Sequence, residues 1–158
     1  MRNLPPFQLL IDEHGAAVHR FLIATIGTGE ADDCYQETFL AALRAYPALR
    51  DASNLRGWLL TIAHRKAIDA ARARARRPMP VAEPGDLSDA AEPDPVPAGG
   101  ELWSLVAALP CKQRAALALR FIGDCAYAEI ASAMQTSPEA ARRSVHEGLR
   151  RLRQEARR

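Results

Sequence analysis

The sequence predicts an all-α protein of two small helical domains joined by a flexible acidic linker. Three observations lead to this prediction. Apolar residues recur with the 3.6-residue period of amphipathic helices on both sides of residues 78–100. Residues 78–100 themselves hold six prolines, three glycines and no basic residue, a composition typical of an extended linker. No segment alternates apolar and polar residues with a period of two, so no strand is expected.

The linker divides the chain into a first domain at residues 4–77 and a second at residues 101–158. Proline breaks helices and glycine is costly to order, so residues 78–100 are not expected to join either domain. Each domain is small, and it must therefore bury its apolar face economically or pack against a partner.

The first two helices of the first domain follow from their apolar faces and their end signals. Gly27 and Gly29 are expected to end the first helix. The second is expected to begin near residues 30–32, because acidic side chains favour a helix N-terminus, and to end at Pro47. The first face consists of Phe7, Leu10, Ile11, Val18, Phe21 and Leu22, and the core side of the second helix of Tyr35, Phe39, Leu43 and Tyr46.

A loop is predicted over residues 47–55, followed by a third helix over residues 55–76 with Pro78 as its stop. This helix carries a basic face, because charged residues recur on it at spacings of four, three and four. These residues are Arg65, Asp69, Arg72 and Arg76. The face is either solvated, with a local Arg65–Asp69 pair that contributes little, or a nucleic-acid surface.

Trp58 lies two turns before this basic face and just after the polar loop. An aromatic ring beside basic residues is the arrangement on which unstacked bases stack. The same ring could instead fill the core of a three-helix domain. The sequence leaves these two interpretations open.

Four helices are predicted in the second domain. Pro110 and Gly123 are expected to end the first two of them. Ser137 is well placed as the N-cap of the last helix, with Pro138 at its first position and Glu139 in its first turn. The helices are expected at residues 102–109, 111–122, 127–134 and from 138 towards the C-terminus, with a three-residue break at 135–137.

The last two of these helices form a candidate helix-turn-helix, in which the first braces the second and the second enters the DNA major groove. Ala131 is small, as a close helix contact requires. Arginines near a helix start can contact both phosphates and guanine edges, and DNA binding is favoured over a solvated helix that binds nothing. The apolar face of the final helix is Ala141, Val145, Leu149 and Leu152, and its basic face is Arg142, Arg143, His146, Arg150 and Arg153.

The second helix of the first domain carries an acidic, polar stripe away from its core side. This stripe should not face DNA, and it is either solvated or a protein-docking surface. Composition alone favours the solvated interpretation. The residues of the stripe are Asp33, Gln36, Glu37 and Arg44.

The net charge of +2 conceals an alternation along the chain. Residues 51–77 carry seven basic and two acidic residues, and residues 102–158 carry ten and five. Residues 78–101, between them, carry six acidic residues and no basic one. Such segmental asymmetry indicates a polyanionic partner more reliably than the total does.

Composition also excludes several classes of protein. The chain has 158 residues, 48% hydrophobic and 25% charged, as folded proteins do. No apolar run reaches the ~18 residues of a membrane span, and the N-terminus is not a secretory signal. Cys34, Cys111 and Cys125 form no CxxC pair, and His14 and His19 are five residues apart. We therefore expect a cytoplasmic protein with mostly buried, reduced thiols, no metal and no other cofactor.

Two stretches resemble the sigma-70 family of RNA polymerase sigma factors. The first has an acidic pair, a Gln-Glu, a Phe-Leu, and then a Trp-Leu helix that ends in arginines, as in sigma region 2. The second opens with Leu-Pro-x-x-x-Arg, continues with Tyr-x-Glu-Ile-Ala and ends in a Ser-started helix, as in region 4. The order and the short linker resemble the small extracytoplasmic-function (ECF, group 4) sigma factors. The stretches are DDCYQETFLAALRAYPAL with LRGWLLTIAHRKAIDAARARARR, and LPCKQRAALALRFIGDCAYAEIASAMQTSPEAARRSVHEGLRRLR.

The resemblance implies a role for each surface. Region 2 binds the polymerase clamp helices and melts and reads the −10 promoter element, with a flipped base held by the loop before the Trp helix. Region 4 reads the −35 element and docks on the polymerase flap, and the acidic linker would suit the basic channels of the polymerase. The implied residues are Asp33, Gln36, Glu37 and Leu40 for polymerase, Asn54, Arg56, Trp58, Arg65, Arg72 and Arg76 for −10, and Arg120, Arg142, Arg143, His146 and Arg150 for −35.

Three positions depart from the family pattern. Gln135 stands where the turn usually has Gly, which predicts a wider turn. Glu147 stands at a position that is often basic, and Arg65 stands where Asn is frequent. A carboxylate at 147 repels phosphate but can accept a hydrogen bond from cytosine N4. These departures concern promoter preference rather than the class of protein.

The sequence thus predicts a sigma factor that binds core polymerase and promoter DNA and is not an enzyme. The resemblance also implies an anti-sigma partner, which could hold the protein at the inner face of the membrane if it is membrane-bound. Two alternatives stay open. One is a stand-alone helix-turn-helix regulator, and the other is a sigma mimic that sequesters a regulator.

Overall fold

The computed structural model describes residues 3–76 and 101–158, and within them every regular element is a helix, which confirms the predicted all-α class. None of these helices is both long and apolar enough to span a bilayer. The linker predicted at 78–100 lies outside the described residues. The elements are α1 (Phe7–Ile26), α2 (Thr28–Ala45), the 3-10 helix η1 (Tyr46–Ala48), α3 (Leu55–Arg76), α4 (Glu101–Ala107), α5 (Cys111–Phe121), α6 (Tyr127–Met134) and α7 (Pro138–Ala156).

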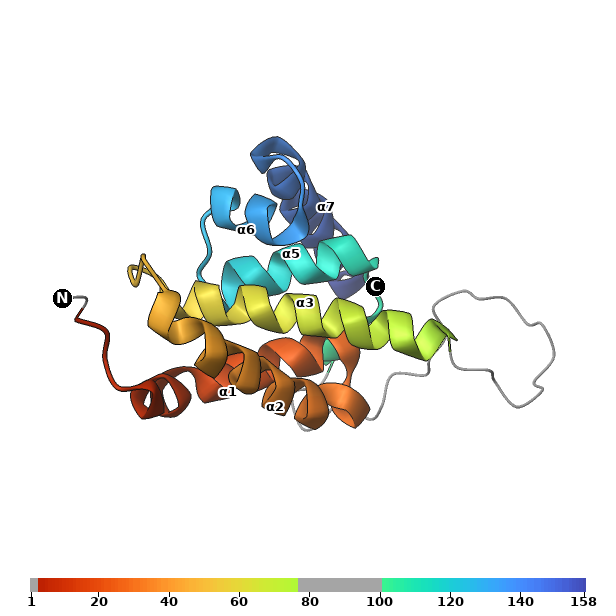
Figure 1. Ribbon diagram of the computed structural model, residues 1–158. Coiled ribbons are helices and arrows are strands. Elements are labelled where there is room, and N and C mark those ends of the chain that lie inside the picture. Colours follow the sequence, from red (N-terminus) through yellow and green to blue (C-terminus); the bar gives the residue numbers. More distant parts are fainter. Residues whose placement is uncertain (1–2, 77–100) are drawn as a thin grey trace.

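The helices stack in layers (Figure 1). Helices α1 and α2 lie below α3, which α5 covers from the other side, and α6 and α7 lie above α5. Each pair among α1, α2 and α3 is in contact, and α5 and α6 both pack on α7. The N-terminal helices therefore form one three-helix unit, and the C-terminal helices form a second one built around the predicted helix-turn-helix.

The boundary between α1 and α2 is a single glycine. Gly27 has φ 83°, in the left-handed region that favours glycine, and its N–H donates to the Ile23 carbonyl at 3.0 Å. Because α2 begins at the next residue, Thr28, the expectation that Gly29 helps to end the first helix is wrong. Gly29 lies in the first turn of α2, which starts earlier than the acidic residues indicated.

The buried face of α2 is made largely of small residues, which let the helix pack closely against α1 and α3. Leu43, predicted as core, is instead 51% exposed, because it follows buried Ala42 and one residue turns the helix by about 100°. Thr38 is fully buried but satisfied, since its Oγ1 donates to the Cys34 carbonyl at 2.6 Å. The buried residues are Ala31, Cys34, Thr38, Phe39 and Ala42.

The last helix starts as the sequence predicts. Ser137 adopts an extended conformation, and its Oγ accepts a hydrogen bond from the Ala140 N–H at 3.1 Å. This bond satisfies one of the N–H groups that a helix N-terminus leaves unpaired. Ala141 and Val145 are buried, as predicted for the apolar face, and Leu149 and Leu152 pack partly buried against the same core.

The turn between α6 and α7 keeps a compact form. Gln135 adopts the left-handed conformation with φ 54° and ψ 49°, and the Thr136 N–H donates to the Ala131 carbonyl at 2.9 Å. This bond pattern is the one that a glycine normally forms at a helix C-terminus. The expected wider turn is therefore wrong, since Gln135 itself takes the backbone conformation of the glycine.

We expect Gln135→Gly to raise the free energy of unfolding by up to about 1 kcal/mol. Glycine relieves the left-handed strain, and the gain is reduced because glycine also makes the unfolded chain more flexible. Urea denaturation followed by helix ellipticity measures the change. Ser132→Gly, at an exposed position inside α6, is the matched control and should destabilise by about 0.5–1 kcal/mol. Equal destabilisation by both variants would contradict the strain at Gln135.

The two helical units also pack against each other, through α1 and α3 on one side and α5 and α6 on the other. Arg114 donates from Nη1 to the Thr25 carbonyl at 3.0 Å, and from Nη2 to the Leu109 carbonyl at 2.9 Å. A Cβ on Gly123 would lie 2.7 Å from the backbone oxygen of Leu119, so the turn after α5 favours glycine, and it would lie 2.6 Å from Leu60 Cδ1 on α3. Buried residues of both units form one cluster. Each unit is too small to bury its apolar surface alone, and it buries part of that surface against the other unit.

Candidate nucleic-acid interface

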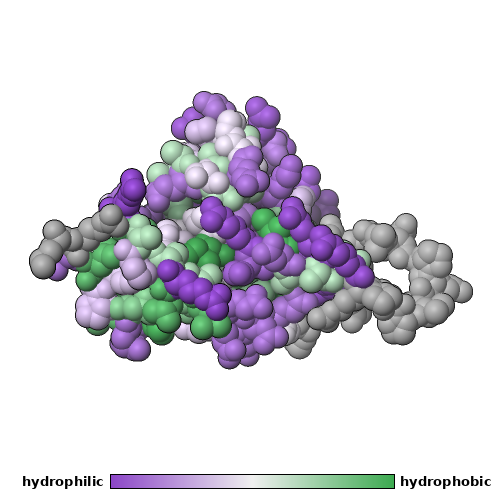
Figure 2. Space-filling view, viewed as in Figure 1, coloured by the Kyte–Doolittle hydropathy of each residue, from purple (hydrophilic) through white to green (hydrophobic). Residues whose placement is uncertain are grey.

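The basic face predicted on the last helix is exposed along its whole length. The opposite side of α7 is buried against α5 and α6, so the fold fixes which way the basic residues point. Hydrophilic residues cover the part of the surface where α7 lies (Figure 2). The exposed residues are Arg142, Arg143, His146, Arg150 and Arg153. Among the described residues none of these side chains has a carboxylate within ion-pair distance.

Glu147, which departs from the family pattern, does not lie on this face. It is half-buried and accepts a long hydrogen bond, 3.4 Å, from Gln113 Nε2 on α5. Its carboxylate is therefore directed to the packing side of α7 and not along the exposed arginine face. The sequence could not indicate this, because the partner is more than thirty residues away.

A tyrosine that the sequence did not single out as a site residue connects two of the predicted DNA contacts. Tyr127 is half-buried at the start of α6. The guanidinium carbon of Arg120 lies 4.7 Å from its ring centroid, and that of Arg142 lies 5.0 Å away. Arg120 also donates from Nη1 to the Cys125 carbonyl at 2.9 Å. The three side chains come from α5, α6 and α7 and meet only in the folded protein.

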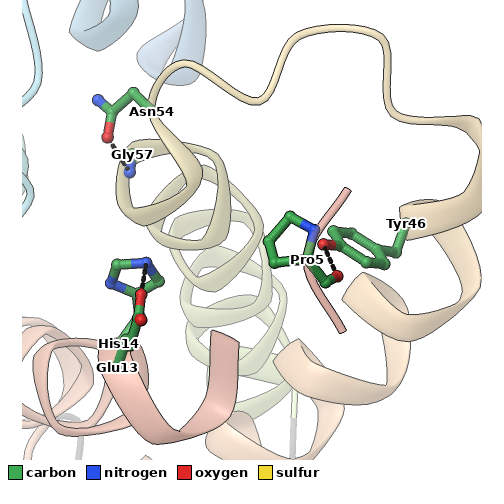
Figure 3. A network of polar contacts seen from close by, with 6 residues as sticks. All are labelled: Pro5, Glu13, His14, Tyr46, Asn54 and Gly57. Carbon is green, nitrogen blue, oxygen red and sulfur yellow. Dashed lines mark hydrogen bonds and ion pairs between the residues drawn. The ribbon is translucent and has the colours of Figure 1, made fainter. Parts of the chain in front are cut away.

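The loop before α3 is stabilised by its own side chains. Asn54 Oδ1 accepts from the Gly57 N–H at 2.9 Å and so caps α3, as Figure 3 shows. Asp51 Oδ1 accepts from the Ser53 N–H at 2.9 Å, and the side-chain and backbone hydrogen bonds of Ser53 lower the pKa of that carboxyl. These two hydrogen bonds tie side chains of the loop to nearby backbone N–H groups.

The loop also contacts the second helical unit. Asn54 Nδ2 donates to Glu129 Oε2 on α6 at 3.0 Å. The other oxygen of Glu129 accepts from the Ala126 N–H at 3.1 Å and stabilises the start of α6. The side chain of Asn54 is thus shared between capping α3 and bridging to the helix-turn-helix.

An open hollow of about 450 Å³ lies between this loop and the turn after α5. His14 lines it, and burial, followed by the charge of Arg56, lowers the pKa of this histidine, while Glu13 opposes the shift. Figure 3 shows His14 on α1 facing the first turns of α3. The remaining lining residues are Ala52, Ser53, Asn54, Leu55, Arg56, Gly123 and Asp124.

The basic face of α3 is exposed as predicted, with Arg65, Arg72 and Arg76 all at the surface. No ion pair forms between Arg65 and Asp69, whereas Arg74, which the sequence analysis did not select, pairs with Glu30 of α2 through Nε at 2.9 Å. The Arg74 pair attaches the end of α3 to the start of α2. The exposed arginines therefore keep their charge available to a ligand.

Trp58 occupies an intermediate position. It is half-buried, packs against the core, and its ring lies 6.1 Å from that of Tyr46 with a 40° tilt. Tyr46 is itself buried and donates its hydroxyl to the Pro5 carbonyl (Figure 3). Part of the Trp58 ring therefore belongs to the core of the three-helix unit, and part of it reaches the surface beside the loop.

The exposed face of α2 becomes apolar towards its C-terminal end. Asp33, Gln36, Glu37 and Leu40 are all exposed on one helix face. Leu40 is 54% exposed, and Leu43, one turn further on, is 51% exposed. Two exposed leucines therefore lie beside acidic groups on the surface of α2. Figure 2 shows the largest hydrophobic area on the side of the molecule where α1 and α2 lie.

The three cysteines differ in their exposure, and none forms a disulfide in the described part of the chain. Cys34 and Cys125 are buried and Cys111 is exposed, and all three are free. Burial, with smaller contributions from Glu129 and Asp124, raises the pKa of Cys125 to about 11, so its nucleophilic thiolate form is rare at neutral pH. No group of three or more His, Cys, Asp or Glu residues within 3–76 and 101–158 is placed to hold a metal.

Sequence comparisons connect both helical units to known regions. Residues 10–77 match the family Sigma-70 region 2, and residues 99–152 match Sigma-70, region 4. The chain is 35% identical over 153 residues to the ECF RNA polymerase sigma factor SigD of Mycobacterium tuberculosis, covering 87% of this chain and 71% of that protein. It is 27% identical to the ECF RNA polymerase sigma factor SigX of Bacillus subtilis, and the match covers 93% of this chain and 81% of SigX.

Solved structures show the same fold. The sigma factor RpoE in complex with the anti-sigma factor NepR from Bartonella quintana superposes with a TM-score of 0.74 at 20% identity, over 94% of both chains. CnrH in complex with the cytosolic domain of CnrY superposes with a TM-score of 0.64 at 22% identity, over 95% of this chain and 86% of CnrH.

Proposed function

The chain belongs to the ECF sigma factors of the sigma-70 family, and from this premise we propose that it binds core RNA polymerase and directs initiation at specific promoters. One observation carries the proposal beyond family membership. A single chain presents an exposed acidic and apolar face on α2 and, separately, an exposed arginine face on α7. The first suits a protein and the second a nucleic acid, and a sigma factor must contact both. The chain itself catalyses no reaction in this proposal.

The arginine face of α7 is assigned to the −35 element as duplex. Residues near the start of a recognition helix contact base edges, while those further along contact phosphates. Arg142, Arg143 and His146 fit the first role and Arg150 the second. Arg120 supports the site from α5, where its ring and carbonyl contacts hold it.

The loop before α3 and the exposed side of α3 are assigned to the −10 element. Extruding a base costs a few kcal/mol, which stacking and hydrogen bonds must offset. In this proposal the half-buried Trp58 supplies the stacking, and the exposed arginines supply the hydrogen bonds. Because Asn54 Nδ2 already donates to Glu129 Oε2, a base contact through that amide uses its second N–H or displaces the Glu129 carboxylate. The assigned residues are Asn54, Arg56, Trp58, Arg65, Arg72 and Arg76.

The α2 stripe of Asp33, Gln36, Glu37 and Leu40 is assigned to the polymerase clamp helices, and the second unit to the flap. An anti-sigma factor that covers these faces completes the proposal. Support comes from two solved proteins with this fold. The structure of RpoE was solved with the anti-sigma factor NepR, and that of CnrH with the cytosolic domain of CnrY. The protein would then act in the cytoplasm, and a membrane-bound anti-sigma factor would hold it at the inner face of the membrane.

In vitro transcription tests the proposal against its alternatives. Core polymerase is supplied with genomic promoter fragments, with and without the full chain. Promoter-dependent transcripts only in the presence of the chain are the expected result. Core binding without initiation on any fragment would favour the sigma mimic. Tight duplex binding by the chain alone, without any association with core polymerase, would favour the stand-alone regulator.

We expect Leu40→Arg to weaken binding to core polymerase by about 2 kcal/mol or more, roughly thirtyfold, as for an apolar residue central to an interface. The fold should be unaffected, because this side chain is 54% exposed. Ala16→Arg, at an exposed position on α1, adds the same charge and is the matched control. Competition for core polymerase against a labelled sigma factor measures both variants. Equal affinity of the two would remove Leu40 from the docking surface.

A further inference from the structure

The two guanidinium groups beside Tyr127 are arranged as a preformed anion site. Arg120 and Arg142 approach the same aromatic ring at 4.7 and 5.0 Å from its centroid. Neither side chain has a carboxylate partner within the described parts of the chain. The ring attracts both cations through its quadrupole but does not neutralise them. Two uncompensated positive charges beside one ring are complementary to a polyanion.

The ring has a defined position of its own. Tyr127 is the first residue of α6, whose start is fixed by the hydrogen bond from the Ala126 N–H to Glu129 Oε1. Part of the side chain packs against the core formed by buried residues of α5, α6 and α7. A ring held in this way offers a fixed surface, so an arginine lying on it loses much of its rotational freedom before DNA arrives.

The two arginines depend on the ring to different degrees. Arg120 is half-buried and is also held by the Cys125 carbonyl, whereas Arg142 is exposed. Within residues 3–76 and 101–158, the Tyr127 ring is the one ring, ionic or hydrogen-bonding partner of the Arg142 side chain. A free arginine side chain loses up to about 2 kcal/mol of rotamer entropy when it is ordered. The orientation of Arg142 is therefore the property most sensitive to residue 127.

We propose that Tyr127 is a positioning residue for −35 recognition, which orders Arg142, and secondarily Arg120, in the orientation that the DNA requires. This inference rests on the proposed role of α7 in reading the −35 element. Tyr127 acts through the arginines, and the ring face rather than the hydroxyl is the active feature. Preorganisation of this kind improves affinity by reducing the entropy lost on binding.

The experiment uses the full chain assembled with core polymerase, on a promoter fragment that gives transcripts with it. Equilibrium binding is measured for the wild type, Tyr127→Leu, Tyr127→Phe, Arg142→Ala and the Tyr127→Leu/Arg142→Ala double variant. Each is also measured on fragments with single base-pair changes in the −35 element. Thermal unfolding of each variant shows whether the fold is retained.

We expect Tyr127→Leu to weaken binding by about three- to tenfold and to reduce discrimination at the base pair that Arg142→Ala also affects. Tyr127→Phe should stay within about twofold of wild type, because the ring remains. In the Arg142→Ala background the effect of Tyr127→Leu should largely disappear, since coupled residues are not additive.

Four results would overturn the proposal. If Tyr127→Phe is as impaired as Tyr127→Leu, the hydroxyl and not the ring is responsible. If Tyr127→Leu loses affinity equally on all fragments and also in the Arg142→Ala background, its role is only structural. If Tyr127→Leu binds the promoter as tightly as wild type while Arg142→Ala does not, α7 reads the −35 element but Tyr127 does not position Arg142. If neither variant changes binding, the −35 assignment of α7 itself is wrong.

Discussion

Replacing both Arg142 and Arg143 with alanine is expected to weaken promoter binding through the −35 element by about 2–6 kcal/mol, since each bidentate base contact contributes about 1–3 kcal/mol. Both side chains are exposed near the start of α7, where a recognition helix meets base edges. Folding should be unaffected, because the buried side of α7 is unchanged. Transcription from −35-dependent promoters should fall in parallel with the loss of affinity.

The control for this result is the Arg157→Ala/Arg158→Ala double variant. It removes the same charge from the end of the chain, beyond the last residue of α7. This control variant is expected to lose only long-range attraction to the phosphates. The salt dependence of its DNA affinity should fall, and its base preference should not change. Binding is measured by fluorescence anisotropy of the holoenzyme on promoter duplexes at several salt concentrations. Equal losses and unchanged base preference in both double variants would show that Arg142 and Arg143 contact only the backbone.

Replacing Leu60 with alanine is expected to lower the free energy of unfolding by about 2–5 kcal/mol, as for other fully buried leucines. Leu60 lies on α3 and is completely buried, and its Cδ1 faces Gly123 of the second helical unit. The cavity would therefore open at the junction between the units. Because buried residues of both units form one cluster, we expect one cooperative unfolding transition. In Leu60→Ala the whole transition should move to a lower urea concentration.

Urea denaturation followed by helix ellipticity and by tryptophan fluorescence tests this prediction. Trp58 is in the first unit, and Trp103, the only other tryptophan, belongs to α4 in the second. Leu102→Ala is the matched control, since Leu102 is 59% exposed and should change stability by less than about 0.5 kcal/mol. Two separate transitions, of which Leu60→Ala shifts only the first, would contradict a shared core.

Much of this fold could be predicted because its signals are local. Capping and breaking residues act within one turn of the backbone, so Gly27, Ser137 and Pro138 marked helix ends that the structure confirms. The start of α3 at Leu55 and the start of α7 were predicted to the residue. The exposed face of α7 was predicted for a similar reason, since a helix with a 3.6-residue apolar period has its polar side opposite.

The errors have a common origin in contacts between segments far apart in the chain. The spacing of Tyr35, Phe39 and Leu43 predicts Leu43 as core, but the small residues of α2 determine which side packs against α1 and α3. Gln135 was expected to widen its turn, whereas the packing of α6 on α7 holds it in the left-handed conformation. Tyr127 could not be linked to Arg120 and Arg142 before three helices were placed together.

The sequence by itself determined the helices, the order of the two units and the arginine face of α7, because periodicity and capping act over a few residues. Only the tertiary structure decided that the two units pack on each other through Gly123 and Arg114. It also decided that Asn54 donates to Glu129, and that two arginines contact the ring of one tyrosine. The physical reason is that side-chain contacts across tens of residues depend on which helix faces meet, and this is fixed by burial and shape over the whole molecule.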